Sequence, residues 1–271
     1  MARSALGFIG AGNMAEAIAR GVLRSALYAP SQVIAADPAP ERRAVFADLG
    51  VNAVADTAQA AANSDILILA VKPQMIDAAV AQIRPALAPG TLVISIIAGL
   101  SAAYLEGALA TGGAQLRIIR VMPNTPMLVG AGMTALSRGT HATDADLAAA
   151  EAIFVSGGKV VRVDEAQMDA VTALSGSGPA YIFLLTEAMA AAGAKLGLTE
   201  QHAATLARQT VVGAAKLLAE SKDAPAELRR KVTSPKGTTQ AAIESFEGQH
   251  FAQVVLAAMS AAATRSKELG K

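Results

Sequence analysis

The 271-residue sequence contains no cysteine and no tryptophan, and aromatic residues make up only 3% of it. The absence of cysteine excludes disulfides, thiolate nucleophiles and cysteine-based zinc sites. So few aromatic rings also argue against a base-stacking surface for nucleic acid. The three histidines, His141, His202 and His250, lie outside any recognisable motif. We therefore expect no metal site and no histidine-based hydrolytic centre.

Charge and long apolar runs are scarce as well. Charged residues make up 17% of the chain and the net charge is +1, against about 25% charged residues in typical soluble domains. This balance lacks the basic stripe of a nucleic-acid-binding protein. No apolar run approaches the roughly 20 residues that span a bilayer, and no signal-peptide pattern opens the chain. We therefore predict a cytoplasmic protein that binds neither nucleic acid nor membrane. The 53% hydrophobic content, mostly small side chains, hints at an oligomer.

The first 164 residues alternate short apolar runs with helical patterns. Runs that are apolar on both faces are typical of parallel strands covered by helices, and their alternation with helices indicates a doubly wound α/β sheet. We predict a Rossmann-like dinucleotide-binding domain over residues 1–164. Its expected strands are Leu6–Ile9, Val33–Ala36, Ile66–Val71, Leu92–Ile97, Leu116–Val121, Met133–Leu136 and Val160–Val163, with helices at Asn13–Arg24 and Pro40–Leu49.

After Asp164 the strand-like alternation disappears and only helical patterns follow. We predict an all-α domain over residues 165–271. Its expected helices are Met168–Leu174, Pro179–Ala194, Thr199–Glu220, Ala226–Val232 and Phe251–Leu269, and a further helix continues through Gln240.

The end of the first strand carries a G-x-G-x-x-A motif at Gly10, Gly12 and Ala15. The first glycine permits the tight strand-to-helix turn, the second lets the backbone approach a pyrophosphate, and the small third residue lets the helix pack on the strand. Amides at the helix N-terminus then bind phosphate. Because the motif follows a strand and opens a helix, it predicts a nicotinamide dinucleotide site.

Cofactor preference stays open. Asp37 ends the second strand, where an acid bonds the ribose 2′-hydroxyl and favours NAD, but it is also placed to cap the helix that begins near Pro40. Arg42 and Arg43 follow within reach of a 2′-phosphate. Lys72, before Pro73, is either a ligand contact at the sheet edge or a solvated lysine.

Three further segments have the composition of a binding site, each with a plain structural alternative. Arg120–Pro126 is either a ligand contact or a rigid interdomain connection. In Leu174–Tyr181 the serines either bind a carboxylate or cap a helix. Val232–Thr239 places four hydroxyls before a helix start, which makes a small anion site or a redundant cap.

Together, five segments resemble the signature of the pyrroline-5-carboxylate reductase family, in order and over nearly the whole chain. The resemblance implies a Rossmann domain, a helical dimerisation domain, and a homodimer that in some members assembles into a pentamer of dimers. It implies that NADPH or NADH reduces the C=N bond of 1-pyrroline-5-carboxylate to L-proline, the last step of proline biosynthesis. The five segments are Phe8–Ala15, Ala70–Gln74, Arg120–Pro126, Leu174–Tyr181 and Val232–Thr239.

The resemblance also implies roles for single residues. Thr239 is the catalytic contact, because its hydroxyl matches the one that bonds the ring nitrogen, and the loop that carries it is implied to come from the partner subunit. The implied substrate residues are Glu165, Ser234, Gly237, Thr238 and Thr239. The implied cofactor residues are Gly10, Ala11, Gly12, Asn13, Met14, Asp37, Thr57, Ala70, Val71, Lys72, Pro73, Ile96, Ile97 and Ala98.

The chain departs from the family pattern at Lys236, which stands where the family loop often has glycine. A turn that needs positive φ would be strained by lysine; otherwise the added charge would attract the substrate carboxylate. Two other functions remain open. One is a hydroxyacid dehydrogenase of related two-domain architecture, which would use a catalytic lysine in the helical domain; Lys195 and Lys216 lie on expected helices, but neither sits in a glycine-rich helix start. The other is a cofactor-sensing protein without catalysis.

Overall fold

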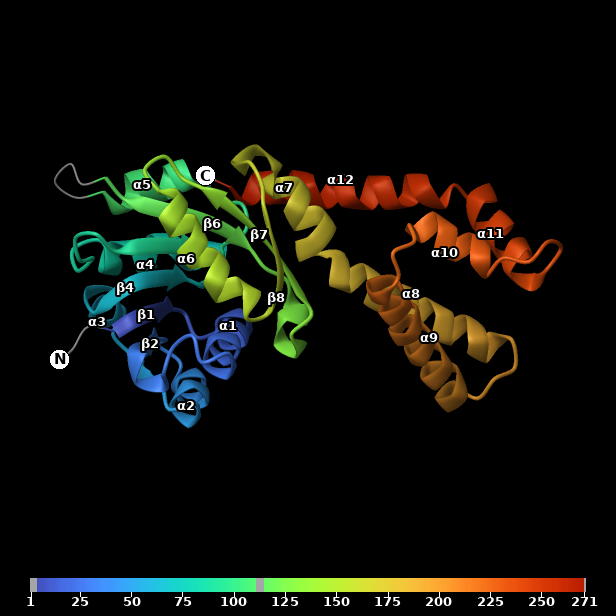
Figure 1. The fold of residues 1–271 in the computed structure, drawn as a ribbon, viewed down its shortest axis with the longest axis horizontal. Helices are drawn as coiled ribbons and strands as arrows, with labels where there is room; N and C mark the ends of the chain where they lie inside the picture. The colour runs from blue at the N-terminus through green and yellow to red at the C-terminus, as the bar shows by residue number, and fades with distance from the viewer. Residues whose placement is uncertain (1–3, 111–114, 271) are drawn as a thin grey trace. The chain divides into compact units, whose positions relative to one another are not determined.

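The computed structural model describes residues 4–110 and 115–270. By packing, the chain divides into two compact units, one formed by residues 1–177 together with 261–271 and the other by residues 178–260 (Figure 1). The functional boundary predicted after residue 164 stays a prediction. None of the described helices combines the length and the apolar character required to cross a membrane.

The first unit contains an eight-stranded sheet in the order β3-β2-β1-β4-β5-β6-β7-β8. Neighbouring strands are parallel except for the antiparallel pair β6 and β7. The first six strands have the order of a doubly wound dinucleotide-binding fold, which confirms the predicted fold class. The strands are β1 (Ser4–Ile9), β2 (Val33–Ala36), β3 (Asn52–Val54), β4 (Ser64–Leu69), β5 (Leu92–Ser95), β6 (Arg117–Met122), β7 (Gly132–Arg138) and β8 (Gly158–Arg162).

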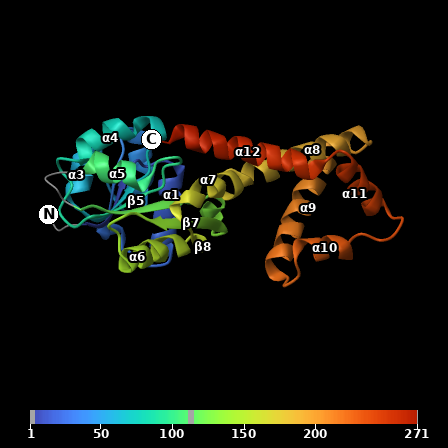
Figure 2. The same cartoon turned by 90° about the horizontal axis from the view of Figure 1, so that it is seen from above.

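Helices cover both faces of this sheet. Alternate strand residues point to opposite faces, so Phe8 packs into one hydrophobic core and the adjacent Ile9 into the other. Figure 2 shows α4 and α6 on opposite sides of the sheet. The first core is covered by α1 (Asn13–Arg24), α2 (Pro40–Asp48) and α6 (Asp144–Val155), and the second by α3 (Thr57–Ala62), α4 (Ile76–Ile83) and α5 (Ala102–Leu109).

Short 3₁₀ turns and one π-helical segment connect these elements. The 3₁₀ turns are η1 (Pro30–Gln32), η2 (Pro73–Met75), η3 (Thr125–Val129) and η4 (Glu165–Gln167). After α7 (Met168–Val171) the chain forms a π-helical segment, η5 (Thr172–Gly176), at the predicted glycine–serine motif. Such π segments occur frequently at functional sites.

The second unit is helical, as predicted. It contains α8 (Gly178–Lys195), α9 (Glu200–Glu220), α10 (Pro225–Lys231), α11 (Thr238–Gly248) and the beginning of α12 (Phe251–Leu269). Among its described residues only Ala203 and Ala207 are buried. Large apolar side chains such as Phe183, Leu184 and Leu256 are more than 60% exposed. A single chain therefore leaves much of the apolar surface of this unit uncovered.

The end of α12 belongs to the first unit. The Ser266 hydroxyl donates a 2.6 Å hydrogen bond to the Asp169 carboxylate, which precedes the π-helical segment. The backbone also approaches closely, because a Cβ added at Gly99 would lie 2.7 Å from the Ser266 carbonyl oxygen. The last turn of the chain thus packs beside the loop that follows β5.

Candidate active site

The glycine turn after β1 has the geometry that its motif predicts. Gly10 has a φ of +94°, and a Cβ there would lie 2.8 Å from the Ala70 carbonyl oxygen, so a side chain is excluded on both grounds. Gly12 is the N-cap residue of α1, and a Cβ there would meet no atom within 4 Å. Ala15 is fully buried against the sheet. The space beside Gly12 is therefore open for a ligand to approach the backbone.

Asp37 connects this turn to the end of β2. One carboxylate oxygen accepts a 2.7 Å hydrogen bond from the Ala11 amide, and the other accepts a 2.9 Å hydrogen bond from the Ala39 amide. The N-cap residue of α2 is Ala39, so Asp37 does not cap that helix. Its carboxylate is instead fixed between the glycine turn and the loop between β2 and α2.

Arg42 braces the same turn from the side of α2. Its Nε donates to the Ala11 carbonyl oxygen at 2.6 Å, and Nη2 donates to Glu16 at 2.8 Å. Burial alone would raise the pKa of Glu16, but hydrogen bonds from Arg42 and Arg20 outweigh it and hold that pKa below the ordinary value. Arg43 folds back to donate to the carbonyl oxygens of Asp37 and Pro38 at 2.8 and 2.7 Å.

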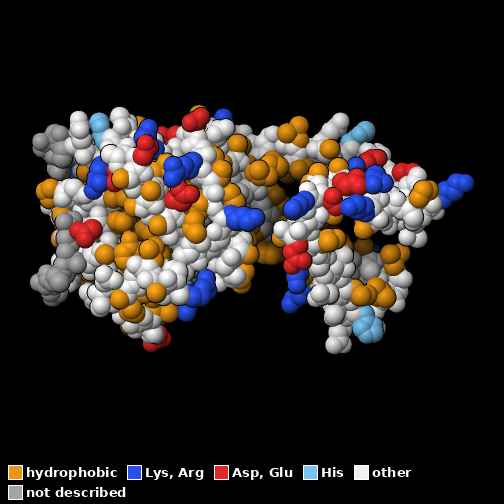
Figure 3. Space-filling view, in the orientation of Figure 1, with side chains coloured by type: hydrophobic (Ala, Val, Ile, Leu, Met, Phe, Trp, Pro, Cys, Tyr) orange, Lys and Arg blue, Asp and Glu red, His pale blue; other side chains and the backbone are white. Residues whose placement is uncertain are grey.

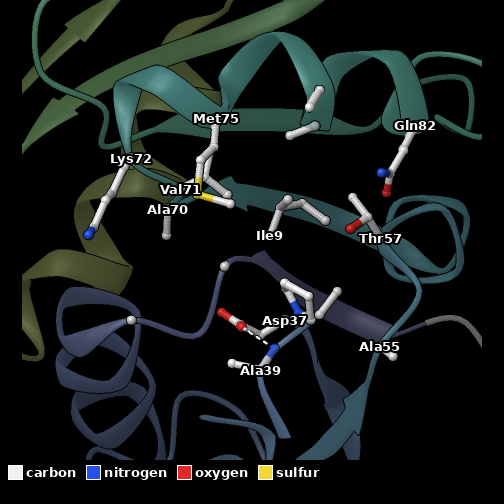
Figure 4. A pocket seen from close by; sticks show the side chains of 16 residues that line it. Ile9, Asp37, Ala39, Ala55, Thr57, Ala70, Val71, Lys72, Met75 and Gln82 are labelled. Carbon is white, nitrogen blue, oxygen red and sulfur yellow. Dashed lines mark hydrogen bonds between the residues drawn. The ribbon is translucent and has the colours of Figure 1, made fainter.

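A cavity of about 470 Å³ lies at the carboxyl ends of β1, β2 and β4 (Figure 4). Open α/β sheets bind ligands at this edge. Of the predicted cofactor residues, those that line the cavity are Gly10, Gly12, Asp37, Thr57, Ala70, Val71 and Lys72; Ala11, Asn13, Met14, Pro73, Ile96, Ile97 and Ala98 do not.

One wall of the cavity was missed by the sequence interpretation. The η2 turn and α4 supply Met75, Ala78, Ala79 and Gln82. The available signal was the helical spacing of Ile76, Ala79, Val80 and Ile83, which are the residues that α4 buries. In Figure 4 Gln82 and Thr57 lie together at one end, and Lys72, which immediately precedes η2, lies at the other.

The predicted residues after β5 form a short loop beside this region. The Ile96 amide donates to the Leu69 carbonyl oxygen at 3.1 Å, and the Ile97 amide donates to the Ser95 hydroxyl at 3.3 Å. Ile97 is buried, whereas Ile96 and Ala98 are half-buried. The chain after β5 is therefore held against the end of β4 and keeps part of its surface accessible.

Asn124 has a structural role. Its side-chain oxygen accepts from the Met133 amide at 2.8 Å, and its amide nitrogen donates to the Ser175 carbonyl oxygen and hydroxyl at 3.2 and 3.3 Å. It therefore ties the Arg120–Pro126 segment to the π-helical segment, which supports the connection alternative for this residue.

The predicted substrate residues divide between the two units. Glu165 lies in the first unit, where it accepts a 2.7 Å hydrogen bond from the Ala102 amide at the start of α5. The other four lie in the second unit, where the loop with Ser234 and Gly237 leads into α11 and Thr238 and Thr239 are the first two residues of that helix. Gly237 is the N-cap residue and has no side chain to cap the helix, so the first amides of α11 have no partner within the helix.

Lys236 adopts a φ of +60° at this loop. The turn therefore does need a left-handed residue, and lysine occupies it at a steric cost that glycine avoids. The Lys236 amide donates to the Gln240 side chain at 2.7 Å, which fixes the turn to the first turn of α11.

The sheet order and the glycine turn facing a cavity define an oxidoreductase of the Rossmann type that uses a nicotinamide dinucleotide. A family model described as pyrroline-5-carboxylate reductase dimerisation matches residues 165–269, and one described as NADP oxidoreductase, coenzyme F420-dependent, matches residues 5–99.

Full-length relatives narrow the assignment. The pyrroline-5-carboxylate reductase of Pseudomonas aeruginosa is 44% identical over 100% of this chain and 98% of its own. A solved pyrroline-5-carboxylate reductase from Coxiella burnetii has a TM-score of 0.90 at 38% identity, covering 99% of both chains. The pyrroline carboxylate reductase of Plasmodium falciparum, solved with NADP bound, has a TM-score of 0.87 at 31% identity over 100% of both chains. The chain belongs to the pyrroline-5-carboxylate reductase family.

Proposed function

We propose that this protein reduces the C=N bond of 1-pyrroline-5-carboxylate to give L-proline with NADPH or NADH, as the last step of proline biosynthesis. The observation that carries the proposal is the full-length identity of 44% to a protein of that name. The open space at Gly12 and the hydroxyl-rich loop before α11 support it, because they suit a pyrophosphate and a small carboxylate.

The residues around the glycine turn fit a nicotinamide dinucleotide. The backbone at Gly12 and the first amides of α1 would hold the pyrophosphate, since no Cβ blocks that approach. Asp37, Thr57, Ala70, Val71 and Lys72 would line the remainder of the site. The other proposed contacts are Ala11, Asn13, Met14, Pro73, Ile96, Ile97 and Ala98. The bound dihydronicotinamide supplies the hydride for the imine carbon.

Thr239 and its neighbours would position the substrate. The free amides of Thr238 and Thr239 at the start of α11 favour a carboxylate, aided by the Ser234 hydroxyl and the narrow turn at Gly237. The Thr239 hydroxyl would bond the ring nitrogen and fix the imine for transfer. We propose Glu165 as a further substrate contact. The ring nitrogen, protonated before or during hydride transfer, carries the proton that the amine of L-proline requires. Orientation and exclusion of water therefore suffice, and no strong general base is required.

The uncovered apolar surface of the second unit supports association of two copies. Exposed side chains such as Phe183, Leu206, Val212 and Phe246 would lose contact with water at an interface between copies. We propose a homodimer built through residues 165–271, with the substrate loop contributed by the partner subunit and a pentamer of dimers as the larger assembly.

We also propose a cytoplasmic location. On the face drawn in Figure 3, basic and acidic side chains lie interspersed.

The test is the loss of reduced-nicotinamide absorbance on addition of 1-pyrroline-5-carboxylate. We expect Thr239→Ala to lower kcat/KM about tenfold or more, the loss of one hydrogen bond to a charged group. Thr239→Ser, the matched control, keeps the hydroxyl and should retain most activity. An unchanged kcat/KM in Thr239→Ala would remove Thr239 from the site.

Turnover of a hydroxy acid without imine reduction would point to the dehydrogenase alternative. Cofactor binding without any turnover would point to a cofactor-sensing protein.

A further inference from the structure

We infer that Asp37 makes this protein select NADH over NADPH. The cofactor preference goes beyond the proposed function and rests on it only where turnover is measured. At one end of the cavity, the adenosine ribose of a dinucleotide would meet the loop between β2 and α2.

Two hydrogen bonds fix the position of the Asp37 carboxylate but leave part of its acceptor capacity unused. The amides of Ala11 and Ala39 each occupy one of its oxygens, at 2.7 and 2.9 Å. An ionised carboxylate offers about four lone-pair sites, so acceptor capacity remains toward the cavity that Asp37 lines. Ribose hydroxyls are donors and suit this acceptor. A 2′-phosphate has only acceptors and adds negative charge of about −1.5 to −2 next to the carboxylate.

The nearby cations are already engaged. Arg42 donates to the Ala11 carbonyl oxygen and is paired at 2.8 Å with Glu16, a carboxylate that it shares with Arg20. Arg43 donates from one nitrogen to two backbone carbonyl oxygens, those of Asp37 and Pro38. Neither arginine lines the cavity, whereas Asp37 does. A 2′-phosphate would therefore meet a fixed anion before it met an available cation.

Among the residues that line the cavity, the cation is Lys72. Lys72 follows β4, and Figure 4 draws it on the wall opposite the loop that carries Asp37 and Ala39. Its position suits the pyrophosphate, which NADH and NADPH share, so it does not distinguish the two cofactors. Discrimination at the ribose therefore falls to Asp37.

The experiment compares the two cofactors by binding and by turnover. The chain has no tryptophan whose emission could report binding. The dissociation constants are therefore measured from the change in the fluorescence of NADH and NADPH themselves. We expect NADH to bind about tenfold or more tightly and to show a correspondingly higher kcat/KM. Asp37→Asn keeps the shape and an acceptor oxygen but removes the charge, and should reduce the NADH preference about tenfold. Asp48→Asn, an exposed change of the same charge at the end of α2, should leave it unchanged.

A second measurement needs no variant and therefore does not depend on how Asp37→Asn folds. ADP and 2′-phospho-ADP compete with bound NADH on the unaltered protein, and ADP should compete at lower concentration. Preference of the unaltered protein for NADPH, or an unchanged ratio in folded Asp37→Asn, would overturn the inference. Tight NADH binding without imine reduction would instead support the inference and refute the proposed reductase function.

Discussion

The guanidinium of Arg120 lies 3.4 Å from the carboxylate of Glu165, measured between Nη1 and Oε1. The Arg120 side chain is only 6% exposed, and its Nε and Nη2 are buried without a hydrogen-bond partner among the described residues. The same Glu165 oxygen accepts the Ala102 amide. Glu165 is thus the counter-charge of a buried cation as well as a proposed substrate contact.

Glu165→Gln should therefore destabilise the fold, even though glutamine can still accept from the Ala102 amide. The buried Arg120 would lose its counter-charge, and we expect the free energy of unfolding to fall by about 1–3 kcal/mol. Denaturant unfolding measures this. The double variant Arg120→Met with Glu165→Gln should recover part of the loss, because it no longer buries an unpaired charge. Losses that simply add would contradict the pairing.

Gly12→Ala should separate folding from cofactor binding. No atom lies within 4 Å of the added methyl group, and the φ of −69° suits alanine, so thermal stability should be retained. The methyl group would occupy the approach of the pyrophosphate, and we expect NADH affinity to fall about tenfold or more. Gly10→Ala is the contrasting variant, because it should lower stability itself. Unaltered affinity in Gly12→Ala would place the pyrophosphate elsewhere.

Lys236→Gly should stabilise the protein. The φ of +60° at this position is open to glycine without steric cost, and relief of the left-handed strain is worth about 1 kcal/mol. Urea unfolding of the two proteins gives the difference. Lys236→Ala removes the charge but keeps the Cβ, so it should give no such gain. Equal stabilisation by both variants would assign the effect to charge and not to backbone conformation.

The Glu16 carboxylate should make the free energy of unfolding depend on pH in the acidic range. Its pKa lies below the ordinary value of 4.5 because Arg42 and Arg20 outweigh the effect of burial. A depressed pKa in the folded state contributes stability above the ordinary value, and the contribution is lost as pH falls through the folded pKa. Unfolding of the unaltered protein and of Glu16→Gln should therefore differ near neutral pH and converge in acid. A difference in the free energy of unfolding that did not change with pH would show that the ionisation of Glu16 does not contribute to stability.

Strong local signals predicted much of the fold. The helices Asn13–Arg24 and Phe251–Leu269 and the strand Val33–Ala36 have the predicted bounds, because apolar periodicity and flanking turns mark them. Short elements were missed. The strand β3 has three residues, and α3 is a six-residue helix in which alanine does not mark the buried face. The helix α4 has only eight residues, although its buried side chains have helical spacing.

The candidate site divides in the same way. The glycine turn follows from a local motif, so Gly10 and Gly12 were predictable. The bond between Asp37 and the Ala11 amide joins residues 26 apart in the chain, and no local pattern specifies it. The sequence allows either conformation at Lys236, and the φ of +60° there follows only from the backbone geometry of the turn.

The return of the last turn of α12 to the first unit gives residues 178–260 two covalent attachments to it, one at each end. A protease that cuts this helical unit once would leave both fragments carrying part of the first unit, one through its sheet and the other through the contacts of Ser266 with Asp169 and Gly99. A nicked chain would therefore migrate as two pieces under denaturing conditions yet remain one particle in native solution.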